Sequence, residues 1–245
     1  MFPIAALLVA VLGFASAQGW TQIPRSLLQV SGNLNYLWGV DHDMAVFMCE
    51  RPCTRNWKVI PGYLVQLDAD DQYVWGVNMD DEIFFRPVDG TGHWTKVLGH
   101  LIHVSTSGHG YIWGTNRNHN TFKCKKPCSG DWVKVDGHLK QVDGGDREVC
   151  GINEQNTIFC RPVDGSGTWR HVSDGFTYVT ASGSYDIFAV GTNNAVFSCK
   201  KPCIGHEWNQ LGHNQLTRLV QCDATINALF GVDSSESTWR KDIAL

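Results

Sequence analysis

The chain of 245 residues lacks the features that would place it in several common classes of protein. Its net charge is only −4, from 20 basic and 24 acidic side chains, which gives no reason to expect a nucleic acid as partner. There is no Asn-x-Ser/Thr sequon, so N-glycosylation at a consensus site is excluded. No stretch shows a sustained helical period, which favours strands over helices.

Catalytic and metal-binding patterns are missing as well. No nucleophile, base and orienting residue form a recognisable set, and the ten histidines lack the two-ligand spacing of a hydrolytic zinc site. The run from Asp164 to Trp169 is similar to the aspartate boxes of sialidases, but its glycines fall in different places. The carboxylates of Asp68 to Asp71 would suit calcium, yet the segment has no EF-hand pattern and is expected to form an exposed turn. We therefore expect a protein that is not an enzyme, with no cofactor and no metal.

The first 17 residues are predicted to be a secretory signal peptide. An apolar run from Ile4 to Phe14, too short to cross a bilayer, precedes the small residues Ala15-Ser16-Ala17 that signal peptidase requires. The segment lacks a basic side chain, and a buried N-terminal strand is the alternative. Cleavage after Ala17 would leave a secreted, extracellular chain of residues 18–245, with no membrane span.

What the chain has is a repeat. A tryptophan recurs at intervals of 37 to 39 residues, at Trp20, Trp57, Trp94, Trp132, Trp169 and Trp208. In each copy a bulky residue, such as Trp38, is followed nine positions later by Phe or Trp, such as Phe47. A short Gly-x-Asx consensus, as in Gly39-Val40-Asp41, is predicted to mark the end of a strand and a tight turn. The six copies span about 20–56, 57–93, 94–131, 132–168, 169–207 and 208–245.

Each copy contains four short segments rich in aromatic and β-branched residues. In the second they are Trp57 to Ile60, Leu64 to Asp68, Tyr73 to Val77 and Glu82 to Arg86. Four strands per repeat of this length are typical of a propeller blade, so we predict an all-β, six-bladed β-propeller in one domain. No Trp-x-x-Ile segment follows Trp239, and the N-terminal segment from Trp20 to Ile23 is expected to supply the missing strand and close the ring.

The nine cysteines predict four disulfides and one free thiol. Repeats one, three and five each carry two cysteines separated by three residues, one of them a proline, which brings them within disulfide range. Zinc is the competing interpretation, but these pairs lie about a third of the chain apart. Two cysteines confined to repeat four suggest a bridge across a hairpin. The last is expected to be a buried thiol, with pairing to another molecule as the alternative. The predicted pairs are Cys49–Cys53, Cys124–Cys128, Cys199–Cys203 and Cys150–Cys160, with Cys222 free.

The chain resembles the tectonin family of β-propeller lectins, which includes lipopolysaccharide-binding tachylectins and fish-egg lectins. The likeness rests on the Trp-Gly-Val-Asn turn, and on Cys-Lys-Lys-Pro-Cys loops that alternate with Arg-Pro-Val-Asp-Gly-x-Gly loops at Arg86 to Gly92 and Arg161 to Gly167. It extends from about Trp20 to Trp239. The resemblance implies a secreted lectin without enzymatic activity, which recognises microbial surface glycans such as lipopolysaccharide in innate immunity or agglutination.

Repeat one departs from this pattern, with Arg25 in place of a glycine and Glu50-Arg51 in place of two lysines. Repeat five is irregular at Asp174-Gly175, and repeat six has extra residues before Leu219.

Two sets of loop residues are candidates for contact with a ligand. The disulfide loops would hold cationic side chains outward for phosphates and acidic sugars, although they are equally explained as solvated charges. These residues are Arg51, Lys125, Lys126, Lys200 and Lys201. On the alternate repeats, an arginine, an aspartate and a tryptophan suit a carbohydrate, although an Arg–Asp ion pair within the loop explains the same residues. These residues are Arg86, Asp89 and Trp94, and Arg161, Asp164 and Trp169.

Two functions remain open from the sequence. A multivalent lectin would gain avidity from several loops that engage one repetitive surface. A non-catalytic propeller that recruits another immune or egg protein would use the same loops.

Overall fold

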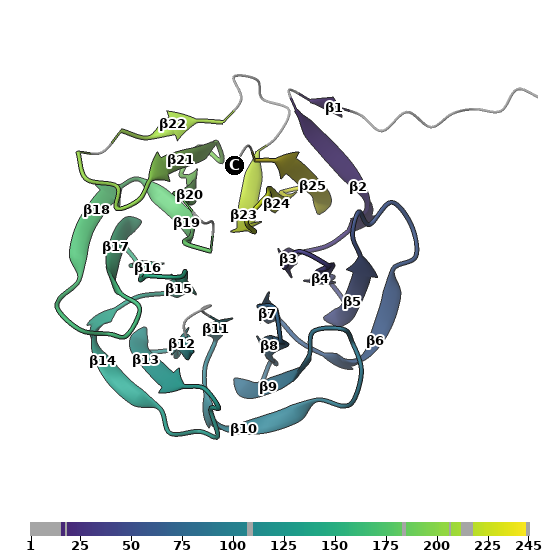
Figure 1. Ribbon diagram of the computed structural model, residues 1–245, viewed down its shortest axis with the longest axis horizontal. Coiled ribbons are helices and arrows are strands. Elements are labelled where there is room, and N and C mark those ends of the chain that lie inside the picture. The colour runs from purple at the N-terminus through teal and green to yellow at the C-terminus, as the bar shows by residue number, and fades with distance from the viewer. Residues whose placement is uncertain are drawn as a thin grey trace, which may run out of the picture.

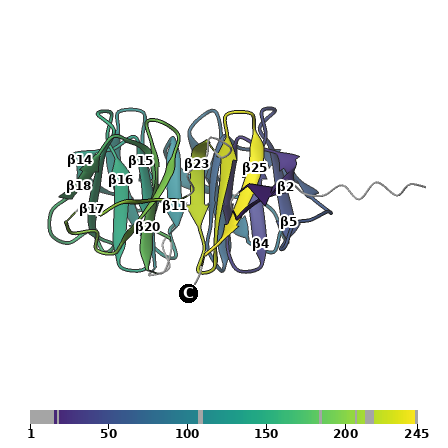
Figure 2. The same cartoon turned by 90° about the horizontal axis from the view of Figure 1, so that it is seen from above.

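The structure is a computed structural model, which describes residues 16–17, 19–106, 110–182, 185–205, 207–211 and 218–243. In these residues the chain forms strands β1 to β25 and no helix. The strands make six antiparallel sheets arranged around a central axis, as Figure 1 shows. Viewed from the side, the sheets stand next to one another as the blades of a disc (Figure 2). The predicted six-bladed β-propeller is confirmed.

Each blade is a four-stranded meander that runs from the axis to the rim. Blades 1 to 3 consist of β3 (Gln29–Gly32), β4 (Tyr36–Val40), β5 (Ala45–Glu50) and β6 (Lys58–Tyr63); β7 (Gln66–Ala69), β8 (Tyr73–Val77), β9 (Glu82–Pro87) and β10 (Thr95–His100); and β11 (His103–Thr106), β12 (Tyr111–Thr115), β13 (Asn120–Lys125) and β14 (Val133–His138).

Blades 4 and 5 repeat this order, and blade 6 combines strands from both ends of the chain. They consist of β15 (Gln141–Gly144), β16 (Glu148–Ile152), β17 (Thr157–Pro162) and β18 (Arg170–Asp174); β19 (Phe176–Thr180), β20 (Asp186–Gly191), β21 (Val196–Lys200) and β22 (Asn209–Gln210); and β23 (Leu219–Ala224), β24 (Ala228–Asp233), β25 (Ser237–Asp242) and β2 (Trp20–Ser26).

The sequence repeat and the blade are offset by one strand. The repeat that begins at Trp57 supplies β6 at the rim of blade 1 and then the inner three strands of blade 2. Each recurring tryptophan therefore stands at the start of an outermost strand. Every repeat spans two blades, and this ties neighbouring blades together covalently.

The N-terminal strand closes the ring, as predicted. β2 pairs antiparallel with β25, with Trp20 opposite Lys241 and Ile23 opposite Thr238. The short β1 (Ser16–Ala17) adds a fifth strand to this sheet. Residues 1–15 of the predicted signal peptide lie outside the described residues, so cleavage after Ala17 stays a prediction. Without β1, blade 6 would have four strands like the other blades.

The repeated glycine has a different role from the one predicted. Gly39 lies within β4, and a Cβ there would stand 2.6 Å from Leu27 Cδ1 and 2.9 Å from the carbonyl oxygen of Gln29. The equivalent glycines of blades 2, 3, 4 and 6 meet a leucine in the same way. In these five blades the glycine thus leaves room for a leucine that lies at the start of the innermost strand or just before it. The Asx residue does make the turn, since Asp41 Oδ1 accepts hydrogen bonds from the amides of Asp43 and Ala45.

On blades 2, 3 and 4 the recurring tryptophan joins the outer strand to the preceding blade by a hydrogen bond. Trp94 Nε1 donates to the carbonyl of Pro61 at 2.9 Å, and its ring lies where a side chain on Gly62 would be. In blade 6, Arg25 replaces this glycine, and the buried Nε1 of Trp57 finds no partner among the described residues. The Nε1 atoms of Trp20 and Trp208 likewise find no partner among the described residues, so this bond between blades is confined to three of the six repeats.

Glutamines hold the inner strands together around the axis. Gln66 Nε2 donates to the carbonyl of Val104 in the next blade, and Gln66 Oε1 accepts from the amide of the same residue, both at 2.8 Å. Gln29, Gln141 and Gln221 make the same bidentate contact. His103 and Tyr178 take this position in the other two blades.

All four predicted disulfides are present. Cys49–Cys53, Cys124–Cys128 and Cys199–Cys203 close loops on blades 1, 3 and 5, and Cys150–Cys160 joins β16 to β17. Cys222 is a free thiol, as predicted, and its burial raises its pKa well above the ordinary value.

Candidate functional site

One face of the disc carries both kinds of patterned loop. In an antiparallel meander, the connection between the first and second strands and the connection between the third and fourth emerge at the same end. We call this end the loop face. It carries the inner loops, residues 33–35, 70–72, 145–147 and 225–227, and the outer loops, residues 51–57, 88–94, 126–132, 163–169 and 201–205.

The arginines of the outer loops on blades 2 and 4 are enclosed by their own loops. Arg86 is 4% exposed, and its Nη2 donates to the carbonyls of Gly90 and Gly92 while the guanidinium lies 5.2 Å from the centre of the Trp94 ring. Burial lowers the pKa of Arg86, yet the group stays charged at any ordinary pH. This side chain shapes the loop from within and is not presented to a ligand.

Arg161 repeats the arrangement on blade 4. Its Nη2 donates to the carbonyls of Gly165 and Gly167, and its Nη1 pairs with Asp136 at 2.6 Å. The guanidinium lies 5.1 Å from the centre of the Trp169 ring.

The Arg–Asp ion pair predicted within each of these loops is not formed. Asp89 Oδ1 instead accepts hydrogen bonds from the amide and the hydroxyl of Thr91, and these bonds lower its pKa. Asp164 Oδ1 accepts from the amide of Ser166, which likewise lowers its pKa. Each carboxylate turns toward the amide two residues ahead because this closes a local turn without desolvating an ion pair. Both carboxylates remain exposed to solvent on the loop face.

A tryptophan from the preceding blade clamps each of these loops. Trp38 Nε1 donates to the carbonyl of Val88 at 3.0 Å, and its ring meets that of Trp94 edge to face at 6.3 Å. In the same way, Trp113 Nε1 donates to the carbonyl of Val163, and the Trp113 ring meets the Trp169 ring edge to face. Trp94 and Trp169 are therefore mainly packing residues with partly exposed rings.

The disulfide loops present half of their predicted cations outward. Lys125 and Lys200 are exposed. Lys126 and Lys201 turn toward the axis, where Lys126 pairs with Asp70 and Lys201 Nζ donates to the carbonyl of Ala181 at 2.6 Å. The expectation that all four lysines point outward is wrong for these two, because the Asp70 carboxylate and the Ala181 carbonyl attract them toward the axis.

Arg51 also turns inward on blade 1. Its Nη1 donates to the carbonyl of Asn33 at 2.8 Å, and its Nη2 donates to Asn227 Oδ1 of blade 6. Arg51 therefore ties the first blade to the last at the loop face.

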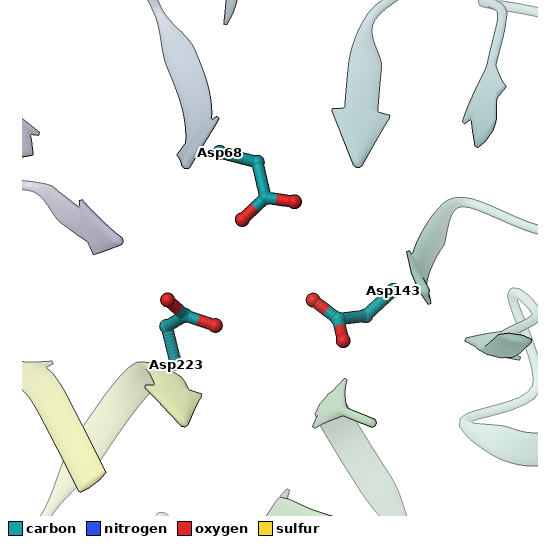
Figure 3. Close-up of side chains that lie close together, drawn as sticks. All are labelled: Asp68, Asp143 and Asp223. Carbon is teal, nitrogen blue, oxygen red and sulfur yellow. The ribbon is translucent and has the colours of Figure 1, made fainter. Parts of the chain in front are cut away.

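Three buried aspartates meet on the axis, as Figure 3 shows. Asp68, Asp143 and Asp223 come from the innermost strands of blades 2, 4 and 6, and their closest oxygens lie within 4.8 Å of one another. Ser31, Ser105 and Thr180 stand at the same position in blades 1, 3 and 5. Among the described residues this is the group whose donor type and spacing would suit a hard cation.

Hydroxyl and amide donors surround the three carboxyls. Asp68 accepts hydrogen bonds from Ser31 Oγ and the amide of Thr106, and Ser182 Oγ lies 3.0 Å from Asp143 and 3.1 Å from Asp223. Burial, followed by repulsion from Asp223, raises the pKa of Asp143 to about 7. Burial also raises the pKa values of Asp68 and Asp223.

Sequence reasoning missed this cluster. It treated Asp68 to Asp71 as one exposed turn, whereas Asp68 is buried on the axis, Asp70 is paired with Lys126 and Asp71 is exposed. The signal was present, because Cys222 aligns with Leu67 and Val142, so that the residue after each one is an aspartate.

Solved structures share the fold. A crystal structure of human WBSCR16 superposes with a TM-score of 0.60 at 12% identity, over 88% of this chain and 71% of that one. The crystal structure of Kap60 bound to yeast RCC1 (Prp20) gives a TM-score of 0.60 at 10% identity, over 88% of this chain and 70% of that one. The structure of Prp20p from Saccharomyces cerevisiae gives a TM-score of 0.60 at 10% identity, over 88% of this chain and 72% of that one. At such identities the likeness shows the fold alone.

Three further findings concern the class and family of the chain. No curated protein matches the chain. In the described residues there is no helix of the length and apolar character needed to span a membrane. The Tectonin domain matches residues 10–91 and 63–244, which together cover nearly the whole chain. With its alternating loops, its ring of repeats and this match, the chain belongs to the tectonin family.

Proposed function

We propose that the protein is a secreted, multivalent lectin that binds bacterial surface glycans such as lipopolysaccharide, in pattern recognition or agglutination. The observation that carries the proposal is the repetition of rigid, charged loops on one face. Lys125 and Lys200 occupy equivalent positions on disulfide-closed loops of blades 3 and 5, both exposed. Asp89 and Asp164 are equivalent on blades 2 and 4.

Repetition matters because each loop offers only a weak, solvent-exposed contact. A phosphorylated or acidic glycan that recurs across a bacterial surface would engage several loops at once, so that the second contact is effectively intramolecular. The rigid disc fixes the spacing of the loops, which lowers the entropy lost on binding. In this proposal the protein binds its ligand and does not turn it over.

Secretion is part of the proposal. Four disulfides are typical of proteins that fold in an oxidising compartment. Cleavage after Ala17 would release a chain in which blade 6 has four strands.

The substitutions Lys125→Glu and Lys200→Glu together are expected to weaken binding of the secreted protein to immobilised lipopolysaccharide by about tenfold, a loss of about 1.4 kcal/mol. Each substitution replaces an attraction to phosphate by a repulsion. Surface plasmon resonance at low salt measures the two affinities. Raising the salt should weaken lipopolysaccharide binding by the wild type and narrow the difference in affinity between the wild type and the double variant.

The matched control is Lys58→Glu with Lys134→Glu, two exposed lysines on the rim strands β6 and β14 that change the net charge equally. This control should bind as the wild type does. Equal losses in both double variants would show a general charge effect and contradict the loop site. Silence on a glycan array, together with a co-purifying protein, would favour a protein-binding propeller instead.

A further inference from the structure

The face opposite the loop face has an apolar surface around the central axis. We call it the turn face, because it carries the turns between the second and third strands of the blades, residues 41–44, 78–81, 116–119, 153–156, 192–195 and 234–236. The innermost strands begin at this face and end at the loop face. None of the loop residues proposed above as glycan contacts lies here, so the turn face is a separate surface.

Four consecutive blades have an apolar side chain where the innermost strand begins. Leu28, Val65 and Val220 directly precede the axial glutamines of blades 1, 2 and 6, and they are 45%, 40% and 42% exposed. Ile102 takes this position on blade 3 and is partly exposed. The axial glutamines bond each of these strands to the next one in the ring, so the four side chains follow one another around the axis. We call these four residues the apolar arc.

The arc is confined to one side of the ring and continues onto a turn. Blades 4 and 5 have Lys140 and Thr177 at the equivalent position. The amide of Val65 donates to the carbonyl of Val77, and Met79, two residues further along in the turn of blade 2, is 62% exposed. A contiguous exposed apolar patch with a polar border is typical of a protein interaction surface.

Carboxylates border the arc on the turns of the same blades. Asp43, Asp80 and Glu236 belong to the turns of blades 1, 2 and 6. In the described part of the chain, no lysine or arginine lies within ion-pair distance of these three carboxylates. Asp43 and Glu236 contact the ring of His42, which is a cation only when it is protonated.

Cationic side chains offset the acidic border only in part. Arg25 and Arg117 pair with two other carboxylates, those of Asp41 and Asp81. Arg218, just before β23, faces the larger number of carboxylates on the neighbouring turns, so the turn face of blades 6, 1 and 2 keeps a net negative charge. A ligand of the arc therefore meets apolar side chains inside a negative border.

The charge of the border selects among the occupants that an apolar patch could have. A second copy docked by the same face would bring its own carboxylates against these, and like charges across an interface are unfavourable. The headgroups of an anionic membrane would be repelled for the same reason. A basic polypeptide has the complementary charge, and its apolar side chains can cover the arc.

We propose that the turn face binds a basic polypeptide segment in which apolar side chains alternate with lysines or arginines. The apolar side chains would cover Leu28, Val65 and Val220, and the cations would lie against the carboxylates of the surrounding turns. The inference goes beyond the proposed lectin function, because it assigns a protein partner to a face on which no glycan contact is proposed.

The test is fluorescence anisotropy with the full mature protein, at neutral pH and low salt, and three labelled peptides of equal length. The first peptide alternates lysine and leucine, the second replaces every lysine with glutamate, and the third replaces every leucine with serine. The first should bind, and the second and third should each bind at least about tenfold more weakly. Binding of either of these two with the affinity of the first overturns the inference.

Two double variants locate the site. Leu28→Ser with Val220→Ser should weaken binding of the lysine–leucine peptide by about tenfold, because it removes apolar surface from the arc. Asp43→Asn with Asp80→Asn should weaken the same binding by about threefold to tenfold, because it removes two charges from the border. The second pair of substitutions is isosteric and lies at exposed turn positions, so folding is preserved.

Each double variant has a matched control on the loop face. Leu34→Ser with Ile226→Ser changes two side chains of the same two blades, 49% and 45% exposed. Asp71→Asn with Asp146→Asn removes two exposed carboxylates. Both controls should bind the lysine–leucine peptide as the wild type does, and equal losses in variants and controls would contradict the site.

The other occupants are tested with the same Leu28→Ser, Val220→Ser variant. Sedimentation of the wild type alone reports association between copies, and flotation with anionic vesicles reports binding to lipid. Neither should depend on the arc. Loss of self-association or of vesicle binding in this variant, with peptide binding unchanged, would identify a second copy or a membrane as the occupant and overturn the inference.

Discussion

Replacing Gly114 with alanine is expected to destabilise the protein by about 3 kcal/mol, near the upper end for an overpacked core position. The new Cβ would stand 2.4 Å from Leu101 Cδ1 and 2.7 Å from the carbonyl oxygen of His103. Leu101 is buried between blades and the carbonyl belongs to the innermost strand, so relief requires the strand itself to move. Urea unfolding followed by tryptophan fluorescence measures the loss.

A double-mutant cycle with Leu101→Ala isolates the contact. Leu101→Ala alone should cost about 2–5 kcal/mol, and the double variant should cost less than the sum of the two because the alanine occupies part of the space that the leucine leaves. Blade 5 provides an internal control, since it naturally has Ala189 at this position. Ala189→Gly should cost only about 1 kcal/mol. A Gly114→Ala variant with the wild-type midpoint would contradict the packing argument.

Replacing Asp143 with asparagine is expected to stabilise the protein at pH 8 and to do so much less at pH 5. Burial raises the pKa of Asp143 to about 7, whereas the unfolded chain titrates near about 3.9. The folded state therefore holds a proton that the unfolded state releases, so stability falls as pH rises from about 4 to about 7 and stays low above that. Asparagine does not ionise, so the substitution should raise the free energy of unfolding at pH 8 by on the order of 2–4 kcal/mol.

The geometry favours this substitution. Asp143 Oδ1 accepts hydrogen bonds from the amide of Ala181 at 2.6 Å and from Ser182, and the amide oxygen of asparagine accepts in the same place. Urea midpoints at pH 5 and pH 8, with a chelator present so that no divalent cation compensates the carboxyls, measure the difference. The exposed Asp146→Asn should change neither midpoint. Equal destabilisation by Asp143→Asn at both pH values would refute the argument.

The fold was predictable because its signals are local and repeated. The tryptophan spacing defines the number of copies, and each disulfide loop contains both of its cysteines within five residues. The missing outer strand of the last repeat also indicated how the ring closes. Each of these inferences needs only the spacing of residues within a repeat and the number of repeats.

The orientation of the loop side chains was not predictable in the same way. Arg86 binds carbonyls of its own loop, and Lys126 reaches Asp70, which lies 56 residues away. Both orientations depend on which acceptor oxygens the fold brings close to the side chain, and composition does not report that. The axial cluster joins residues 75 and 80 positions apart, and only an alignment of alternate repeats would have brought them together.

The closing strand has a consequence for biosynthesis. β2 leaves the ribosome before every strand of blades 1 to 5, whereas its neighbour β25 follows all of them in the chain. Until β25 has been made, blade 6 keeps an unpaired edge that is open to other chains. Blades 1 to 5 can pair as they emerge, whereas the seam between β2 and β25 cannot form until β25 has been made, and a chain terminated before β25 would stay an open arc.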